Sequence, residues 1–261
     1  DKKEYPSLPE FPKDNIIKMP SKTINSMFKK TIFAVSKDEQ RYVLNGVFLI
    51  IEKGEIKTVS TDGRRLAYIC EKANDDKISG KSIIPTKAVA DILRLISLNE
   101  NIEEITLGFS DNQVAVEIGD ITFQANLIEG VFPNYEQVIP KKSNSKIKIK
   151  TEDMMAAVKQ MAPLTSGKIA SDKASAIKLS FEKNKLAISA NTAGLGSGET
   201  EIEVEYSGDQ IDINFNPSYI KDILQNIEAA NVVFSYTTSQ NPVVLTPENN
   251  ENYICVVMPM R

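Results

Sequence analysis

The sequence predicts an α+β protein built from four similar repeats. Three observations lead to this prediction: a few short amphipathic helices, strand-like segments between them, and a constant spacing. The apolar stripes of the helices begin at Ile24, Val89, Met155 and Ile220, which lie 65, 66 and 65 residues apart. Self-similarity at such a period is typical of repeated structural units that pack against one another.

The four helices are expected where apolar residues recur three and four positions apart. The expected stripes are Ile24, Met27 and Phe28; Val89, Ile92, Leu93 and Ile96; Met155, Val158 and Met161 or Ala162; and Ile220, Ile223, Leu224 and Ile227. Proline beside Ser, Thr or Asn precedes the first, second and fourth helices, in IKMPSK, SIIPTK and INFNPSY. The third begins at Thr151 with two acids in its first turn, and both patterns favour helix starts.

Between the helices the hydrophobic period changes to two. TEIEVEY alternates Ile202, Val204 and Tyr206 with glutamates, and QVAVEI and ITFQANL follow the same pattern. The dipeptides Lys53-Gly54, Asp62-Gly63 and Gly119-Asp120 mark turns. This pattern indicates antiparallel sheet with one buried face. Each repeat therefore reads strand, helix and about three strands, and two repeats form a domain with helices on one side and antiparallel sheets on the other.

Three prolines in similar surroundings indicate the domain organisation. Pro6, Pro133 and Pro259 lie 127 and 126 residues apart, and the second and third each close a pair of repeats. We expect residues 13–136 and 137–261 to form two similar domains and residues 1–12 to be a linker from an earlier one. By the same spacing, Pro6 would close a pair of repeats in an upstream domain of about 120 residues, which is missing from this chain.

The composition argues against several function classes. The chain of 261 residues has no histidine, two cysteines and a net charge of −4. Without histidine, zinc or hydrolase chemistry is disfavoured, and we expect no cofactor, metal or catalytic site. Two cysteines do not make a disulfide framework, and no signal peptide or membrane-spanning segment is found, so we expect a cytoplasmic protein.

Several segments together resemble the bacterial β sliding clamp, the processivity subunit of the replicative DNA polymerase III. They are RYVLNGVF, TVSTDGRRLAYI, VFPNYEQVIP, FNPSYIKDIL and VVMPMR. The resemblance covers essentially the whole chain and corresponds to the family's middle and last domains. It implies two DNA-clamp-type domains, a homodimeric ring in the full-length protein, sequence-independent binding of double-stranded DNA and no catalysis. It also implies that this chain alone cannot encircle DNA, because the ring contact needs the first domain.

In the family, helices line the hole through which DNA passes. Sliding requires weak contacts with phosphates and no contacts with bases. The resemblance and the basic residues of the helices imply these DNA-facing residues: Lys22, Lys29, Lys30, Arg41, Tyr42, Lys87, Arg94, Lys159 and Lys221. Two alternatives stay open: the lysines could be only the solvated faces of amphipathic helices, and Tyr42 could be an aromatic residue of a sheet.

The resemblance also implies a hydrophobic groove for short linear motifs of the polymerase catalytic subunit, the clamp loader and repair proteins. Methionine and leucine side chains suit a deformable groove that accepts a Gln-Leu-x-Leu-Phe-like peptide. The expected residues are Leu44, Thr61, Gly63, Arg64, Arg65, Leu66, Pro133, Val138, Asn216, Tyr219, Pro242, Val256, Val257, Met258, Pro259, Met260 and Arg261. Gly63 would let the peptide approach, and Arg65 and Arg261 could hold its carbonyl groups. Alternatively, VVMPMR is a final core strand, although Pro259 disfavours continuous pairing.

Two other functions are weighed against a DNA clamp. A peptide-binding scaffold would keep the groove but need no positive helix surface, and an enzyme would need buried, clustered acids. AGLGSGET, with its alternating glycines, could suggest a phosphate loop, but it leads into a strand and lacks the usual Lys-Ser/Thr ending. We expect a mobile hairpin loop there.

Overall fold

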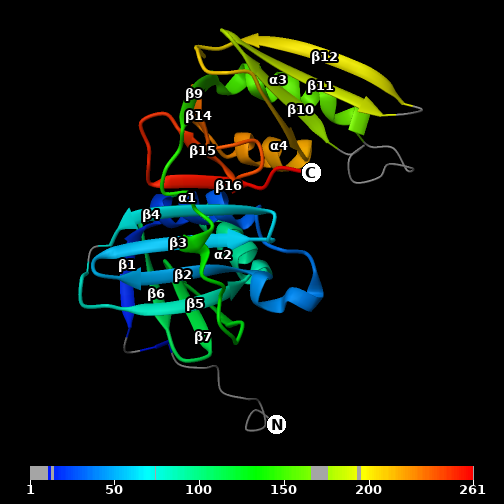
Figure 1. The fold of residues 1–261 in the computed structure, drawn as a ribbon. Coiled ribbons are helices and arrows are strands. Elements are labelled where there is room, and N and C mark those ends of the chain that lie inside the picture. Colours follow the sequence, from blue (N-terminus) through cyan, green and yellow to red (C-terminus); the bar gives the residue numbers. More distant parts are fainter. Residues whose placement is uncertain (1–10, 13–14, 74, 166–175, 193–194, 261) are drawn as a thin grey trace. The chain divides into compact units, whose positions relative to one another are not determined.

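The four repeats expected from the sequence are present in the structure (Figure 1). The computed structural model describes residues 11–12, 15–73, 75–165, 176–192 and 195–260. Pro6 therefore lies outside the described residues, as does most of the expected linker 1–12. Each repeat consists of a strand, a helix and three strands, so the α+β prediction is confirmed.

The first two repeats share one order of elements, and the first also carries a 3₁₀-helix between its helix and its second strand. The first comprises β1 (Ile16–Pro20), α1 (Ser21–Ile32), the 3₁₀-helix η2 (Glu39–Leu44), β2 (Gly46–Glu52), β3 (Glu55–Thr61) and β4 (Arg65–Lys72). The second comprises β5 (Gly80–Pro85), α2 (Thr86–Leu98), β6 (Glu104–Phe109), β7 (Gln113–Ile118) and β8 (Ile121–Asn126).

The last two repeats follow the 3₁₀-helix η3 (Tyr135–Gln137). The third comprises β9 (Ser145–Lys150), α3 (Thr151–Met161), the 3₁₀-helix η4 (Ala162–Thr165), β10 (Ile177–Glu182), β11 (Lys185–Thr192) and β12 (Gly196–Glu203). The fourth comprises β13 (Ile211–Phe215), α4 (Pro217–Gln225), β14 (Asn231–Tyr236), β15 (Val243–Pro247) and β16 (Tyr253–Val257).

The contacts divide the chain into two compact units. Unit 1 consists of Asp1–Ser60 and Cys70–Phe132, and unit 2 consists of Thr61–Ile69 and Pro133–Arg261. The segment 61–69, which falls inside the expected domain 13–136, groups with unit 2 because β4 pairs with β16 there, with Leu66 opposite Val256. This pairing brings the turn after β3 next to the C-terminal residues.

Within each unit, the first strand of one repeat joins the sheet of the other repeat. In unit 1, β1 pairs with β6, and β5 pairs with β2. In unit 2, β9 pairs with β14, and β13 pairs with β10. All of these pairings are antiparallel, so the two repeats of a unit are linked through both of their sheets.

The helices of each unit pack in pairs, α1 with α2 and α3 with α4. The expected stripe of α1 is confirmed, because Ile24, Met27 and Phe28 are fully buried. In α3 one expected position is wrong: Met154, and not Met155, is fully buried, whereas Val158 and Met161 are buried as expected. The methionine pair offers two adjacent apolar positions, and packing selects the one in line with Val158.

Two smaller expectations also differ from the structure. Leu93 is half-buried in α2, where Ala88 completes the buried face instead. Most of the glycine-rich segment expected as a loop belongs to β12, which begins at Gly196, while residues 193–194 lie outside the described residues.

The expected turn at Lys53-Gly54 is confirmed. Both residues have positive φ, as a two-residue hairpin of the I′ type requires.

Candidate functional site

The C-terminal segment leaves the sheet at Met258. Strand β16 ends at Val257, where Val256 is 1% and Val257 0% exposed. Met258 is 39% exposed, and Met260 is half-buried. The core-strand interpretation therefore holds for the two valines, whereas Pro259, which has no N–H group, ends the pairing and releases the methionines to the surface.

Two backbone hydrogen bonds hold these methionines. The amide of Met258 donates to the carbonyl oxygen of Arg64 over 2.9 Å, and the amide of Met260 donates to the carbonyl oxygen of Asn214 over 2.8 Å. Arg64 lies in the turn between β3 and β4, and Asn214 lies in β13. The segment 258–260, called the tail below, is thus attached to two different parts of unit 2.

The turn on one side of the tail is closely hydrogen-bonded. The Asp62 carboxylate accepts from the backbone amides of Arg64 and Arg65 at 2.9 and 3.0 Å. The hydroxyl of Thr61 donates to the Arg65 carbonyl over 2.6 Å and accepts from the amide of Gly63 over 3.0 Å. Gly63 has a φ of 85°, a conformation that favours glycine, and is exposed. The turn therefore presents a fixed, open backbone.

Helix α4 supplies the residues on the other side. Asn216 precedes the helix, and its side chain accepts from the amide of Ser218 over 2.9 Å, as an N-cap does. Tyr219 lies in the first turn, half-buried. The guanidinium carbon of Arg65 is 4.7 Å from the centre of the Tyr219 ring. The ring is thereby held by a cation–π contact.

Arg65 is 9% exposed and bound to two carboxylates. Its Nε donates to Oδ2 of Asp62 over 3.0 Å, and its Nη1 donates to Oδ2 of Asp222 over 2.6 Å. Asp222 lies on α4, three residues after Tyr219. Sequence reasoning did not find Asp62 or Asp222 as site residues. Asp222 shares a helix face with Tyr219, but nothing local indicates a partner 157 residues away.

The remaining expected groove residues occupy different environments. Leu66 is 2% exposed and lies beneath the surface of unit 2, whereas Val138 is 40% exposed and Pro133 is exposed. Pro242 is half-buried just before β15. Leu44 belongs to unit 1, ends η2 and is 7% exposed, and Arg261 lies outside the described residues.

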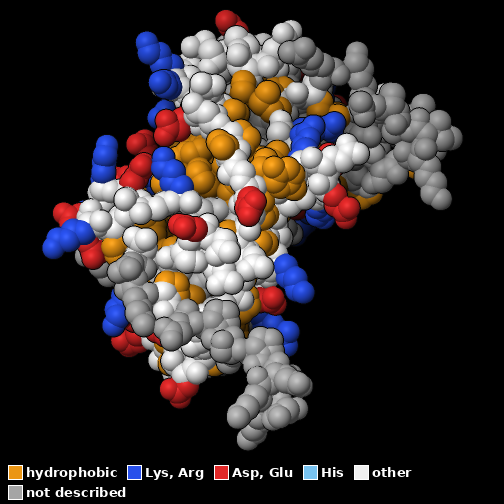
Figure 2. All heavy atoms as spheres, turned by 90° about the horizontal axis from the view of Figure 1, so that it is seen from below, with side chains coloured by type: hydrophobic (Ala, Val, Ile, Leu, Met, Phe, Trp, Pro, Cys, Tyr) orange, Lys and Arg blue, Asp and Glu red, His pale blue; other side chains and the backbone are white. Residues whose placement is uncertain are grey.

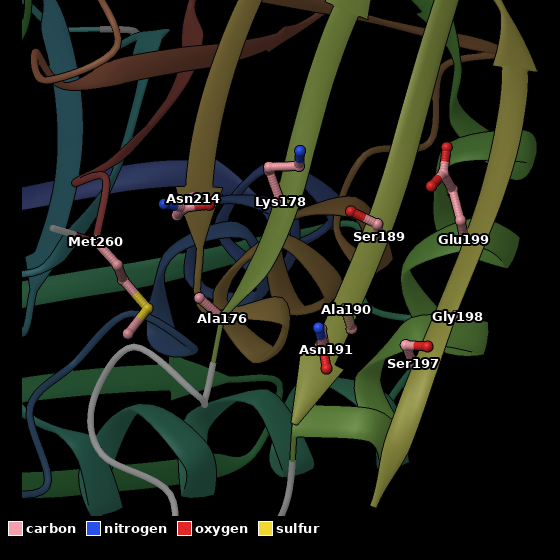
Figure 3. A pocket seen from close by; sticks show the side chains of 10 residues that line it. All are labelled: Ala176, Lys178, Ser189, Ala190, Asn191, Ser197, Gly198, Glu199, Asn214 and Met260. Atoms are coloured by element: carbon pink, nitrogen blue, oxygen red, sulfur yellow. The ribbon is translucent and has the colours of Figure 1, made fainter. Parts of the chain in front are cut away.

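A polar hollow adjoins the tail in unit 2. This hollow of about 690 Å³ is bounded by Met260 and by residues of β10, β11, β12 and β13 (Figure 3). Its polar lining includes Lys178, Asn191 and Glu199, with Asn214 beside Met260. Met260 thus belongs both to the tail and to the lining of this polar hollow. The sequence pattern did not indicate the hollow.

Apolar side chains gather in patches, with charged residues at their margins, on the face shown in Figure 2. Among the described residues, the large apolar side chains that are exposed include Met258, Val138 and Val131 of the segments discussed here. Apolar patches of this kind on a protein surface commonly mark binding sites for other proteins.

The basic residues of the helices lie on their exposed sides. In α1 Lys22 and Lys29 are exposed, the other residues are buried or half-buried, and the helix contains no acid. Lys30 is half-buried near the helix end, where two lysines complement the helix dipole. In α2, Lys87 and Arg94 are exposed. Unit 1 therefore carries a basic surface on its paired helices.

Two other expected DNA-facing residues lie in η2. Tyr42 is 58% exposed and belongs to this 3₁₀-helix, so the alternative that it is a sheet aromatic is wrong. Arg41 is exposed, with its Nε 3.6 Å from Oδ2 of Asp38. In unit 2, Lys159 of α3 and Lys221 of α4 line one hollow of about 730 Å³ together with Ser218 and Gln225.

The titratable groups give no sign of catalytic chemistry in the part of the chain that the structure describes. No group of three acidic or cysteine residues there is arranged to hold a metal ion. Burial raises the pKa of the Cys255 thiol to about 12, so the thiol stays protonated and unreactive. Among the described helices, none is long and apolar enough to cross a membrane.

Comparison with known protein families gives two matches. Residues 18–134 match the family described as DNA polymerase III beta subunit, central domain, and residues 136–261 match the DNA polymerase III beta subunit, C-terminal domain.

Known proteins match along the whole chain. The chain is 34% identical to the beta sliding clamp of Chlamydia pneumoniae and 29% identical to that of Escherichia coli, covering 100% and 99% of this chain and 69% of each relative. Its fold is similar to the crystal structure of the DNA polymerase III subunit beta from Pseudomonas aeruginosa, with a TM-score of 0.91, 28% identity and coverage of 99% of this chain and 70% of the other. The fold is also similar to the crystal structure of the DNA polymerase sliding clamp from Bacillus subtilis, with a TM-score of 0.92 and 27% identity. The match covers 100% of this chain and 68% of the other.

Proposed function

Since this chain belongs to the family of DNA polymerase III β subunits, the bacterial β sliding clamps, we propose that it slides on duplex DNA and docks partner proteins on unit 2. Members of this family are non-catalytic processivity factors of the replicative polymerase. Their partners are DNA, the polymerase, the clamp loader and repair proteins, and the ring is a homodimer. We further propose a cytoplasmic location and domains spanning residues 13–136 and 137–261.

The proposed DNA-facing surface consists of the exposed basic residues of the helices. Unit 1 supplies Lys22 and Lys29 on α1 and Lys87 and Arg94 on α2, all of them exposed. Lys30, Arg41, Tyr42, Lys159 and Lys221 complete the set. Because lysine can bind phosphate as a point charge without fixed geometry, this surface suits a protein that must move along DNA. An overall charge of −4 is compatible with this proposal, because positive charge can still gather locally: α1 carries three lysines and no acid.

The proposed docking groove is centred on the tail. The observation that carries this proposal is the exposure of Met258 directly after the buried end of β16, with its amide bonded to the carbonyl oxygen of Arg64 in the open turn at Gly63. Methionine side chains repack at low cost around different peptides. Leu66, Val256 and Val257 form the buried layer beneath, while Thr61, Arg64, Pro133, Val138, Asn216, Pro242, Pro259 and Met260 are proposed as the walls. Leu44 of unit 1 and Arg261 complete the proposed set of residues.

A peptide titration tests the docking proposal. A fluorescent peptide containing Gln-Leu-x-Leu-Phe should bind the chain saturably, and Met258→Ala or Met260→Ala should weaken binding about tenfold, since each removes apolar contact area from the groove. Fluorescence anisotropy measures the affinity. Leu98→Ala removes a side chain that is 70% exposed on α2 in unit 1, and it serves as the control that should not change binding.

The second candidate function, a peptide-binding scaffold that never contacts DNA, shares this groove. The measurement that separates the two is DNA affinity, which a scaffold does not need. Absence of saturable peptide binding would contradict both candidates, whereas peptide binding without any salt-dependent DNA binding would favour the scaffold.

A further inference from the structure

We propose that Asp222 and Arg65 form a strut that positions the tail and Tyr219, and that Arg65 acts through this strut rather than by holding a bound peptide. The inference rests on the proposed docking function for its effect on binding. It names Asp222 as a positioning residue of the groove, together with Asp62.

Arg65 is held by two carboxylates and an aromatic ring. Its side chain is 9% exposed, its Nε and Nη1 are bound to Asp62 and Asp222, and its planar group lies against the Tyr219 ring. A guanidinium is planar and its donors are fixed in direction, so two donors used on separate carboxylates also fix the plane that supports the ring. Arg65 is therefore suited to orient Tyr219.

The tail is attached to unit 2 by two backbone hydrogen bonds. Met258 is bound to the Arg64 carbonyl in the turn, and Met260 is bound to the Asn214 carbonyl in β13, two residues before the Asn216 cap of α4. The turn is closed by Asp62, which accepts from two backbone amides and from Arg65. One attachment thus depends on the turn, and the other lies at the start of the helix segment.

An ion pair between Arg65 and Asp222 links the two supports of the tail. The 2.6 Å bond between Nη1 of Arg65 and Oδ2 of Asp222 connects the turn to α4, and Asp222 is only 30% exposed. Charge-assisted hydrogen bonds that are partly shielded from water are stronger than exposed ion pairs. The strut thus fixes the separation between the supports of Met258 and Met260. The spacing of the two methionine side chains and the orientation of Tyr219 follow from it.

The decisive substitution is Asp222→Ala, which removes the carboxylate from α4 without touching the tail. Amide hydrogen exchange in the peptide-free protein should become about tenfold faster at Met258 and Met260, because their supports are no longer tied together. The affinity for the fluorescent peptide should fall about tenfold. Asp222→Asn keeps an oxygen that accepts from Arg65, so it should give a smaller change of the same sign and guards against misfolding of the alanine variant.

Glu248→Ala is the matched control. Glu248 lies in unit 2, is 28% exposed and forms an ion pair with Lys148 of the same length, 2.6 Å. This variant should leave the exchange of both tail amides and the peptide affinity unchanged. A general loss of stability would affect both variants alike, whereas the strut predicts an effect of Asp222 alone.

A double-mutant cycle separates positioning from a purely structural role. Since Asp222 acts partly through the ring, its substitution should cost less in affinity when Tyr219 is already alanine, because only its effect on the tail then remains. An undiminished loss in that background, or unchanged tail exchange in Asp222→Ala, overturns the strut. Altered tail exchange in a protein that fails to bind the peptide would instead sustain the strut and overturn the docking function.

Discussion

Cys255 shows at the residue scale how burial controls chemistry in this protein. The residue is fully buried in β16, and loss of solvation raises the pKa of its thiol to about 12 from an ordinary value of 9.0. Burial likewise raises the pKa of Tyr253, two residues earlier. Each of these buried groups therefore stays protonated in the folded protein, because its charged form would lose solvation.

This burial predicts that the free energy of unfolding falls as the pH rises above about 9. Between pH 9 and 12 the unfolded chain releases the Cys255 proton and the folded chain retains it, so the unfolded state binds fewer protons and gains stability. Denaturant titrations from pH 8 to 10.5 measure the slope. Cys255→Val should make it shallower by up to about 1.4 kcal/mol per pH unit.

Cys70→Val serves as the control for this measurement. Cys70 is half-buried, so its replacement removes a thiol without removing the buried one. An equally shallow slope in both variants would show that burial of Cys255 is not the cause.

Val257 and Met258 illustrate how neighbouring residues acquire opposite roles. Val257 is 0% exposed and pairs with Val243 and Arg65, whereas Met258 is 39% exposed. Both residues are apolar, so composition cannot distinguish them. Pro259 indicates that the strand must end, but only the paired strands determine at which residue it does so.

At the scale of elements, α3 shows the limit of reading a helix register from its sequence. The adjacent residues Met154 and Met155 both fit a loose apolar stripe, and the structure buries Met154 completely while Met155 is half-buried. Tertiary packing against β9, β11 and β12 decides between them.

The register of α3 predicts unequal effects of two similar substitutions. Met154→Ala should lower the free energy of unfolding by about 3 kcal/mol, because it leaves a cavity in the core. Met155→Ala, the matched variant, should lower it by less than about 1 kcal/mol, since a half-buried side chain leaves a site that water can fill. Urea denaturation followed by circular dichroism measures both. Equal losses would contradict the register.

The strand exchange between repeats is another feature at this scale. The sequence predicts that β1 and β5 each precede a helix, but β1 pairs with β6 and β5 pairs with β2. Hydrophobic alternation predicts which face of a strand is buried, but it does not predict which other strand pairs with it. The pairing depends on which sheet edges lie close once the helices have packed.

For the whole molecule, most of the proposed DNA-facing residues and most of the proposed groove residues belong to different units. The basic residues of α1 and α2 belong to unit 1, while the tail, the turn and α4 belong to unit 2. Substitutions at distant sites without shared partners usually act independently. The proposed DNA surface of unit 1 and the proposed docking groove should therefore be separable by mutation.

Replacement of Lys22 and Lys29 by glutamate tests this separation. The double variant should bind duplex DNA more weakly and reduce the slope of log affinity against log salt by about 0.9 for each phosphate that it no longer neutralises. Its peptide affinity should equal that of the wild-type chain. DNA affinity is measured by anisotropy at several salt concentrations.

Lys183→Glu is the charge-matched control, since Lys183 is exposed in the turn between β10 and β11. If Lys183→Glu weakens DNA binding as much, for each lysine replaced, as the double variant at Lys22 and Lys29 does, the effect comes from net charge and the helices have no special role. A change in peptide affinity of the Lys22 and Lys29 variant would contradict the separation.

The sequence by itself determined the four repeats and their spacing, the turns at Gly54 and Gly63, and the burial of Ile24 and Phe28. Helix stripes and tight turns depend on residues that are close together in the chain. The pairing of β4 with β16, the choice of Met154 and the bond between Arg65 and Asp222 were decided only by the tertiary structure. Each joins groups that are distant in the chain or chooses between equivalent neighbours, and the free energy of such contacts depends on which surfaces packing brings together.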